Sequence, residues 1–379
     1  MGLLRKIFGI SRDKYQLNAL VSNRIIDRTW ETDFATHIIC DLDKTYVETE
    51  FESWVKMARI PFERPHEKIT VPGASEVLQC LRWSLSDNGS ATTGTSIAPR
   101  SGLHFVSSSP PQLRSALEGK LMLDNLDWTS DTFKNQTYNL RMARIDLLRH
   151  HIAYKTKAIL DVMGKAPDGT SFWMIGDNAE YDPFVYESIR LFLNGSMNIN
   201  DLGEWMAGAK VERRVVAQVL AGHEILPSRG LKVKGVLIRK LAGYPVVQIA
   251  GLTDGISLFD NWFQIAWIWL HQGLIHAQDL VSLVRAFHNL HGVPLQHFRF
   301  CFESVLKNES FDHNLPLFQA LKDIIKWFDS LGVTSKQLVG WTLSFQNPNP
   351  QPAINDGFSA AAKKWYESIE NSRSSRKDR

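Results

Sequence analysis

The stretch Thr36-His37-Ile38-Ile39-Cys40-Asp41-Leu42-Asp43-Lys44-Thr45 decides the fold of this chain. It opens with a short apolar run that contains β-branched residues, and it ends in two acids and a hydroxyl. A run of this length and composition is typical of a buried strand in a parallel sheet. Open α/β sheets bind ligands beyond the carboxyl ends of their strands, so Asp41 and Asp43 are expected at a functional edge. Such a pair can share a divalent cation, or divide into a nucleophile and an acid/base.

The composition is that of an ordinary globular protein. The chain has 379 residues, 44% of them hydrophobic and 22% charged, which gives room for two or three domains. A net charge of +3, without a basic stripe interleaved with aromatics, argues against nucleic acid as a partner. The three cysteines follow no metal-binding spacing, and a sparse, odd number suits a reducing compartment. We therefore predict a cytoplasmic protein.

The N-terminus carries a short amphipathic pattern. Its apolar residues lie beside Arg5 and Lys6; they are Leu3, Leu4, Ile7 and Phe8. Two interpretations stay open: a peripheral anchor at a membrane surface, or a helix that packs on its own domain. Residues 1–29 are predicted to form an N-terminal helical segment.

Polar side chains also follow two later apolar runs. Leu103–Val106 leads into Ser107, Ser108 and Ser109, whose hydroxyl and N–H groups suit the oxygens of a phosphate. Ser171–Ile175 leads into Gly176-Asp177, and Asp182 follows in the same loop. These two acids offer hard oxygen ligands for magnesium.

One basic residue lies between these two runs in the sequence. A helix is predicted to begin near Lys155, which could point into the site and neutralise a phosphoryl group. The set then holds an acidic strand end, a hydroxyl strand end, a lysine and a second acidic strand end.

This set resembles the four motifs of the haloacid-dehalogenase-like phosphohydrolase superfamily: Asp41-x-Asp43-x-Thr45, Ser107, Lys155, and Gly176-Asp177 with Asp182. The flanking residues are similar to one branch, the actin-patch type of phosphatidate phosphatase. The resembling stretches are Val71-Pro72-Gly73, Phe105–Leu113 and Ile175–Tyr186. The chain departs from that branch at Lys44, at Pro111 and at Asn178-Ala179, which weakens the lipid assignment but leaves the catalytic set intact.

The resemblance implies a fold, a reaction and a cofactor. The fold is α/β, a Rossmann-like parallel sheet at residues 30–197, with a mainly helical C-terminal extension. The reaction is phosphomonoester hydrolysis, in which Asp41 attacks phosphorus and Asp43 acts as acid and then base. The cofactor is Mg²⁺, held by Asp41, the Asp43 carbonyl and Asp177, with Asp182 as a supporting group.

The resemblance also implies how the phosphate is bound. Ser107 and Lys155 would hold the transferring phosphoryl oxygens, and Ser108 and Ser109 belong to the same predicted subsite. Thr45 completes the predicted substrate-binding set; it would bond backbone near the nucleophile and fix the turn.

The second half of the chain shows no motif that can be tied to a reaction. Short strands are predicted at 233–238 and 245–249, and a buried helix at Trp262–Leu270. Residues 198–370 are predicted as a mainly helical domain of unknown role, and 371–379 as a disordered tail. A partner-binding module, a lipid-docking module and a packing extension all stay open for this half.

The expected function is a Mg²⁺-dependent phosphatase acting on phosphatidate or a related lipid phosphate at a membrane surface. One alternative is the same chemistry on a soluble phosphate ester. Another is a scaffold or binding protein that uses the phosphatase fold without catalysis.

Overall fold

The computed structural model describes residues 21–25, 34–48, 64–83, 101–109, 113–134, 146–244, 255–307, 316–337 and 358–377. Its strands are β1 (Val21–Ile25), β2 (Thr36–Cys40), β3 (Val47–Glu48), β4 (Ile69–Thr70), β5 (Ser101–Ser107), β6 (Ser130–Lys134), β7 (Ser171–Asp177), β8 (Lys232–Arg239) and β9 (Ile256–Phe259). Its α-helices are α3 (Ala74–Trp83), α4 (Arg114–Leu123), α5 (Asp146–Lys165), α6 (Asp182–Leu193), α7 (Ile199–Gly208), α8 (Arg213–Leu220), α9 (Trp262–His271), α10 (Ala277–His291), α11 (Leu295–Leu306), α12 (Pro316–Ser330) and α13 (Phe358–Lys377). Two 3₁₀ turns, η4 (Pro65–Glu67) and η7 (Pro227–Arg229), connect them.

The main sheet has seven strands in the order β1-β6-β5-β2-β7-β8-β9. Six of them run parallel, and β1 pairs antiparallel with β6 at one edge. The chain passes from β2 to β5 and β6 on one side, then crosses to β7 on the other side of β2. The direction of winding therefore changes between β2 and β7, where such sheets form a crevice for ligands. This arrangement confirms the α/β fold predicted from the sequence.

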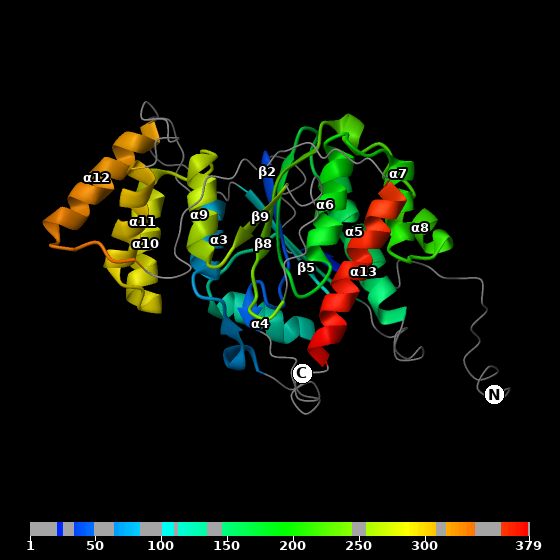
Figure 1. Ribbon diagram of the computed structural model, residues 1–379, viewed down its shortest axis with the longest axis horizontal. Coiled ribbons are helices and arrows are strands. Elements are labelled where there is room, and N and C mark those ends of the chain that lie inside the picture. The colour runs from blue at the N-terminus through cyan, green and yellow to red at the C-terminus, as the bar shows by residue number, and fades with distance from the viewer. Residues whose placement is uncertain are drawn as a thin grey trace.

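Alternation along β2 divides the buried side chains between the two faces of the sheet. Ile39 belongs to a core under α5, α6, α7, α8 and α13, whereas Ile38 and Cys40 belong to a second core under α3, α4 and α9 to α12. Figure 1 shows the two groups of helices on opposite sides of the central strands. A strand buried on both faces has no polar alternation, as the apolar run in the sequence indicates.

The second half of the chain completes both layers. β8 and β9 extend the sheet beyond β7, and α9 to α12 form a helical part beside α3 (Figure 1). The predicted buried helix at Trp262–Leu270 is confirmed as α9, and the predicted strand at 233–238 as β8. Both cores contain side chains from before and after residue 197, and the domain boundary near that residue stays a prediction.

Three predictions about segments need correction. Val21–Ile25 was predicted to be helical and is strand β1, because pairing with β6 outweighs local propensity. Residues 371–377, predicted as disordered, continue helix α13, whose first turns are fixed by buried side chains. Lys155 lies in the middle of α5 rather than at a helix start.

Other expectations fall on parts of the chain that the structure does not describe. The amphipathic pattern at residues 3–8 and the strand expected at 245–249 lie outside the described residues, as do residues 378–379. Among the helices that are described, none is both long enough and apolar enough to span a membrane.

Candidate active site

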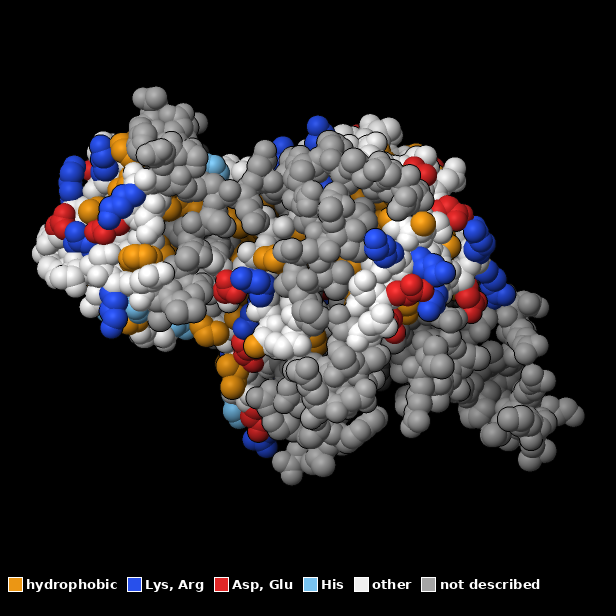
Figure 2. Space-filling model, in the orientation of Figure 1, with side chains coloured by type: hydrophobic (Ala, Val, Ile, Leu, Met, Phe, Trp, Pro, Cys, Tyr) orange, Lys and Arg blue, Asp and Glu red, His pale blue; other side chains and the backbone are white. Residues whose placement is uncertain are grey.

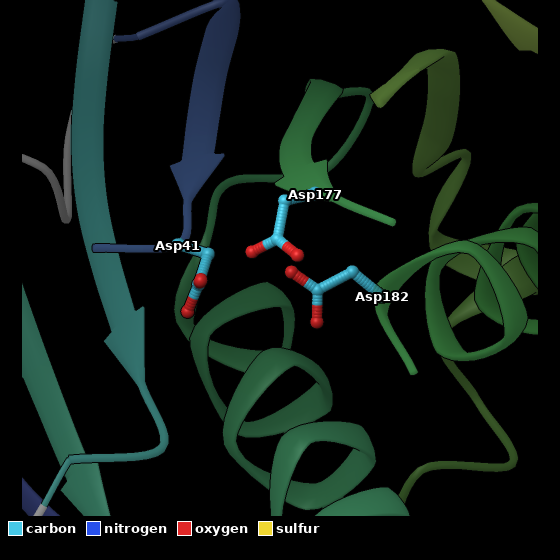
Figure 3. Close-up of side chains that lie close together, drawn as sticks. All are labelled: Asp41, Asp177 and Asp182. Carbon is cyan, nitrogen blue, oxygen red and sulfur yellow. The ribbon is translucent and has the colours of Figure 1, made fainter. Parts of the chain in front are cut away.

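Three aspartates meet at the carboxyl edge of the sheet, where the winding changes direction. Asp41 directly follows β2, and its N–H donates to the Ile175 carbonyl of β7 at 2.9 Å. Asp177 is the last residue of β7, and Asp182 is the first residue of α6. Figure 3 shows their carboxylates turned toward one another. Residues far apart in the sequence are thus brought to one point because parallel strands end at a common edge.

The three carboxylates fit a divalent cation. One ligand oxygen of each lies within 4.8 Å of the others, and all three residues are buried. Among the described residues, Oδ2 of Asp182 is buried without a hydrogen-bond partner, although buried polar atoms are rarely left unpaired. Carboxylate oxygens are the ligands that Mg²⁺ prefers. The donor set therefore suits a hard divalent metal.

Lys155 is the cation that the fold itself supplies to this site. It reaches in from the middle of α5, and its Nζ donates to Oδ1 of Asp41 at 3.2 Å and to Oδ1 of Asp182. Oε2 of Glu180 lies 3.7 Å from the same nitrogen. One ammonium group therefore serves three carboxylates.

Burial and mutual repulsion shift the pKa values of these groups. Burial raises the pKa of Asp41 well above its usual value, with Lys155 opposing and Asp182 adding to the rise. Burial together with Asp182 and Glu180 raises the pKa of Asp177 to about 7. Burial alone would lower the pKa of Lys155, but Asp182 and Asp41 raise it well above its usual value. The site carries more negative charge than Lys155 offsets, which favours binding of a further cation.

Asp43 is held apart from the three aspartates by the serines that follow β5. Ser107 and Ser109 each donate to Oδ2 of Asp43, at 3.0 and 2.6 Å. Its carboxylate is not in the cluster that could hold a metal; the predicted metal contact of Asp43 concerned its backbone carbonyl. The two acids of the motif thus lie in different environments, as different chemical roles require.

The remaining predicted site residues are also brought to this edge. The Thr45 hydroxyl lies 3.4 Å from Oδ2 of Asp177, the long end of the hydrogen-bond range, rather than on backbone near the nucleophile. Ser108 donates to Oε2 of Glu180 at 3.2 Å and lies 3.2 Å from Nδ1 of His151. Glu180 and His151 were not among the predicted site residues. A single charged residue in a loop, or a histidine in a helix, gives no signal that distinguishes it from a surface residue.

The last residue of β8 and the turn after this strand contact both acidic loops from the second half of the chain. Nη1 of Arg239 donates to the carbonyl of Lys44 at 2.6 Å, beside Asp43. Nδ2 of Asn178, beside Asp177, donates to the carbonyl of Tyr244 at 2.9 Å. Nζ of Lys44 donates to the Tyr244 hydroxyl, also at 2.9 Å. Sequence reasoning missed these contacts because they join segments 66 to 200 positions apart without a shared motif.

The fold and this constellation define a haloacid-dehalogenase-like phosphatase domain. Residues 36–196 match the family model of phosphatidate phosphatase APP1, catalytic domain. This segment therefore belongs to that family, and the chain carries the catalytic domain of a phosphoric monoester hydrolase. The match covers less than half of the 379 residues and ends before β8. No curated protein and no solved structure matches the chain.

Proposed function

We propose that this chain is a Mg²⁺-dependent phosphatase that hydrolyses phosphatidate, or a related lipid phosphate, through an aspartyl-phosphate on Asp41. The observation that carries the proposal is the buried Asp41 carboxylate, bonded to Lys155 and facing Asp177 and Asp182 at the carboxyl edge of the sheet. The lipid as substrate rests on the family match at residues 36–196. The catalytic and ligand roles below are part of the proposal.

Asp41 and Asp43 divide the two chemical steps. In the first, a carboxylate oxygen of Asp41 bonds to phosphorus, the bond from phosphorus to the alcohol oxygen breaks, and Asp43 protonates that oxygen. In the second, Asp43 takes a proton from water, whose oxygen bonds to phosphorus while the bond to Asp41 breaks. Phosphate leaves, and both residues return to their initial protonation states. The hydrogen bonds from Ser107 and Ser109 keep the Asp43 carboxyl oriented for both transfers.

The residues around these acids bind and orient the phosphate. Lys155 offsets negative charge on the transferring oxygens, and Ser107, Ser108 and Ser109 offer hydroxyl and N–H groups at the end of β5. Thr45, beside Asp177, belongs to the same proposed substrate-binding set. Asp41, the Asp43 carbonyl and Asp177 would hold Mg²⁺, with Asp182 in support, and the bound ion would offset the negative charge of the nucleophile and the phosphate.

Metal binding can be tested without turnover. Because the buried carboxylates repel one another, Mg²⁺ is expected to raise the melting temperature of the protein, and Asp177→Asn is expected to reduce that rise. The control is Asp168→Asn, which changes an aspartate whose side chain is 75% exposed. An equal rise in all three proteins would place the metal elsewhere.

The reaction is tested by phosphate release from phosphatidate in mixed micelles, with Mg²⁺ and with a chelator. We expect release that requires Mg²⁺ and that falls by roughly a thousandfold or more in Asp41→Asn. Asp168→Asn is again the matched control and is expected to behave as wild type. Release that persists unchanged in Asp41→Asn would exclude Asp41 as the nucleophile.

Soluble esters separate the lipid substrate from its alternatives. Asp41-dependent release from soluble phosphate esters but not from micelles would assign a soluble substrate. A folded protein that is inactive on both would favour a scaffold role, with partner binding through the second half of the chain. A place at the membrane surface predicts, in addition, that deleting residues 1–20 lowers activity on vesicles while sparing soluble esters.

A further inference from the structure

A second lysine, Lys134, ends β6 at the same edge of the sheet, and no carboxylate of the described residues lies within ion-pair distance of its Nζ. The residue is buried, and its Nζ is buried without a hydrogen-bond partner in the part of the chain that the structure describes. Lys155, by contrast, has three carboxylates within 4 Å of its Nζ. A buried ammonium group without a partner is costly, so its presence beside a catalytic edge indicates a ligand.

Strand geometry directs Lys134 toward the phosphate side of the site. β6 lies next to β5, and the Lys134 N–H donates to the Ser109 carbonyl at 3.2 Å. Phe133 belongs to the core under α3 and α4, so by alternation Lys134 lies on the opposite face, under α5. β6 is two strands from β2, about 10 Å, and the lysine carries a long flexible stem.

Lys134 interacts electrostatically with groups that themselves contact Ser108. Charge interactions link Lys134 to Glu180 and Lys155, and His151 to Lys134. Ser108 lies 3.2 Å from both the His151 and the Glu180 side chains. The side chains of His151 and Glu180 are each 23% exposed, so a ligand can approach from their side.

We propose that Lys134, together with Ser108 and His151, forms a subsite for the oxygens of the substrate's phosphate. The inference rests on the proposed phosphatase function and adds a binding residue to it. The charge of Lys155 is shared with Asp41 and Asp182, so a second ammonium group, that of Lys134, would add to the positive charge that meets an incoming dianion. An ammonium group binds phosphate as a point charge without demanding a fixed orientation.

Binding of inorganic phosphate to the full chain, with Mg²⁺ present, tests the subsite. Thermal shift and calorimetry are compared for wild type, Lys134→Met and a matched control, Lys157→Met. Lys157 lies on α5 and donates to Asp161 at 2.9 Å instead of facing the site. We expect Lys134→Met to weaken phosphate binding about 10- to 100-fold, as loss of a charge-assisted contact does, and Lys157→Met to leave it unchanged.

The same variants report on folding. Without phosphate, Lys134→Met is expected to melt at or above the wild-type temperature, because an apolar side chain replaces a buried unpaired charge. A lower melting temperature would assign Lys134 to the fold and overturn the proposal. Unchanged phosphate affinity in Lys134→Met would overturn it as well.

Two further arms separate this inference from the function on which it rests. The KM for glycerol 3-phosphate and for phosphatidate in mixed micelles is expected to rise in Lys134→Met, and the substrate that is affected identifies the source of the phosphate. Asp41-dependent turnover with unchanged KM in Lys134→Met would refute the subsite and keep the function. Phosphate binding that depends on Lys134 in a protein without turnover would keep the subsite and refute the function.

Discussion

Two buried lysines at one sheet edge differ in their partners, and this difference predicts opposite effects of the same substitution. Lys155 is bonded to Asp41 and Asp182, which are themselves buried. Lys134 has no such partner among the described residues. Removing a paired buried charge leaves the charges of its partners buried without compensation, which destabilises the fold. Removing an unpaired buried charge removes its desolvation penalty and stabilises the fold.

Lys155→Met is therefore expected to destabilise the protein by about 3–5 kcal/mol in the presence of a chelator. Mg²⁺ is expected to restore part of this loss, because the metal offsets the same carboxylates. Urea unfolding with Mg²⁺ and with chelator measures both effects. A loss equal under both conditions would contradict a shared charge balance between lysine and metal.

A buried pair of histidines connects β2 to β5. Nδ1 of His37 lies 2.8 Å from Nε2 of His104, whose Nδ1 lies 2.7 Å from the Ser130 hydroxyl. Burial lowers the pKa of His37 from 6.5 to about 4 and lowers that of His104 as well. In the unfolded chain His37 thus binds a proton near pH 6.5, whereas in the folded chain it binds one only near pH 4.

Stability should therefore fall as the pH decreases from about 6.5 through 4. Between pH 7 and pH 5, His37 alone is expected to contribute a loss of about 2 kcal/mol in the free energy of unfolding. His37→Gln keeps a hydrogen-bonding group but cannot ionise, so it should lose less over the same range. Urea unfolding at both pH values measures this, with the exposed His66→Gln as control; equal losses in wild type and His37→Gln would refute it.

The chemistry of the site could be predicted residue by residue more readily than its contacts. Asp41 and Asp177 were predictable because each lies at the end of an apolar strand, and parallel strands end together; Asp182 was predictable because it follows in the same loop. The position of Lys155 within its helix was not predictable, because the residues before it show no clear hydrophobic periodicity. Glu180 and His151 were missed because their partners come from distant loops, and no local pattern records such pairing.

At the scale of elements, α7 and α13 pack so closely that one glycine is required. A Cβ on Gly208 would lie 2.5 Å from the backbone carbonyl oxygen of Ser359. A Cβ on Gly203, in the same helix, would lie 3.5 Å from Leu220 and Val216, which is ordinary contact. Trp205 and Trp365 meet edge to face between the two helices, with ring centroids 5.8 Å apart.

Gly208→Ala is therefore expected to destabilise the protein by about 1–3 kcal/mol, because the new methyl group forces the helices apart. Gly203→Ala should be neutral or stabilise by up to about 1 kcal/mol, through helix propensity. Thermal and urea unfolding of the two variants form a matched comparison. Equal effects would show that α13 does not pack on α7 as described.

Elements with a strong apolar pattern were predicted from the sequence, whereas strands that depend on pairing with a neighbouring strand were not. α9 was predictable because Trp262–Leu270 is apolar all round, as a buried helix is. β9 was missed because Ile256–Phe259 is short and gains its strand conformation from β8. β1 was misread as helix for the same reason: its partner β6 lies about 110 positions away.

At the scale of the whole molecule, the candidate active site is built from both halves of the chain. Arg239, which ends β8, donates to the Lys44 carbonyl at 2.6 Å and to Glu48 at 2.6 Å. β8 lies outside the segment that matches the family model. The loop that carries Asp43 thus depends on a residue that the resemblance did not identify.

Arg239→Met is expected to lower kcat about tenfold while changing KM little, because small misplacements of catalytic groups reduce the rate more than binding. Lys232→Met, at the exposed start of the same strand, should leave both constants unchanged. Phosphate release at several substrate concentrations separates the two parameters. A change confined to KM would instead place Arg239 in contact with substrate.

Helix α13 gives the order of synthesis a physical consequence. Trp365 packs against Trp205 and Phe184. The ribosome adds Trp365 160 residues after Trp205. At ordinary ribosomal speed that interval is roughly ten seconds or longer, during which these two stacked rings lack the side chain that covers them. Nascent chains halted before residue 358 should therefore engage chaperones or aggregate, even though every proposed catalytic residue has already been made.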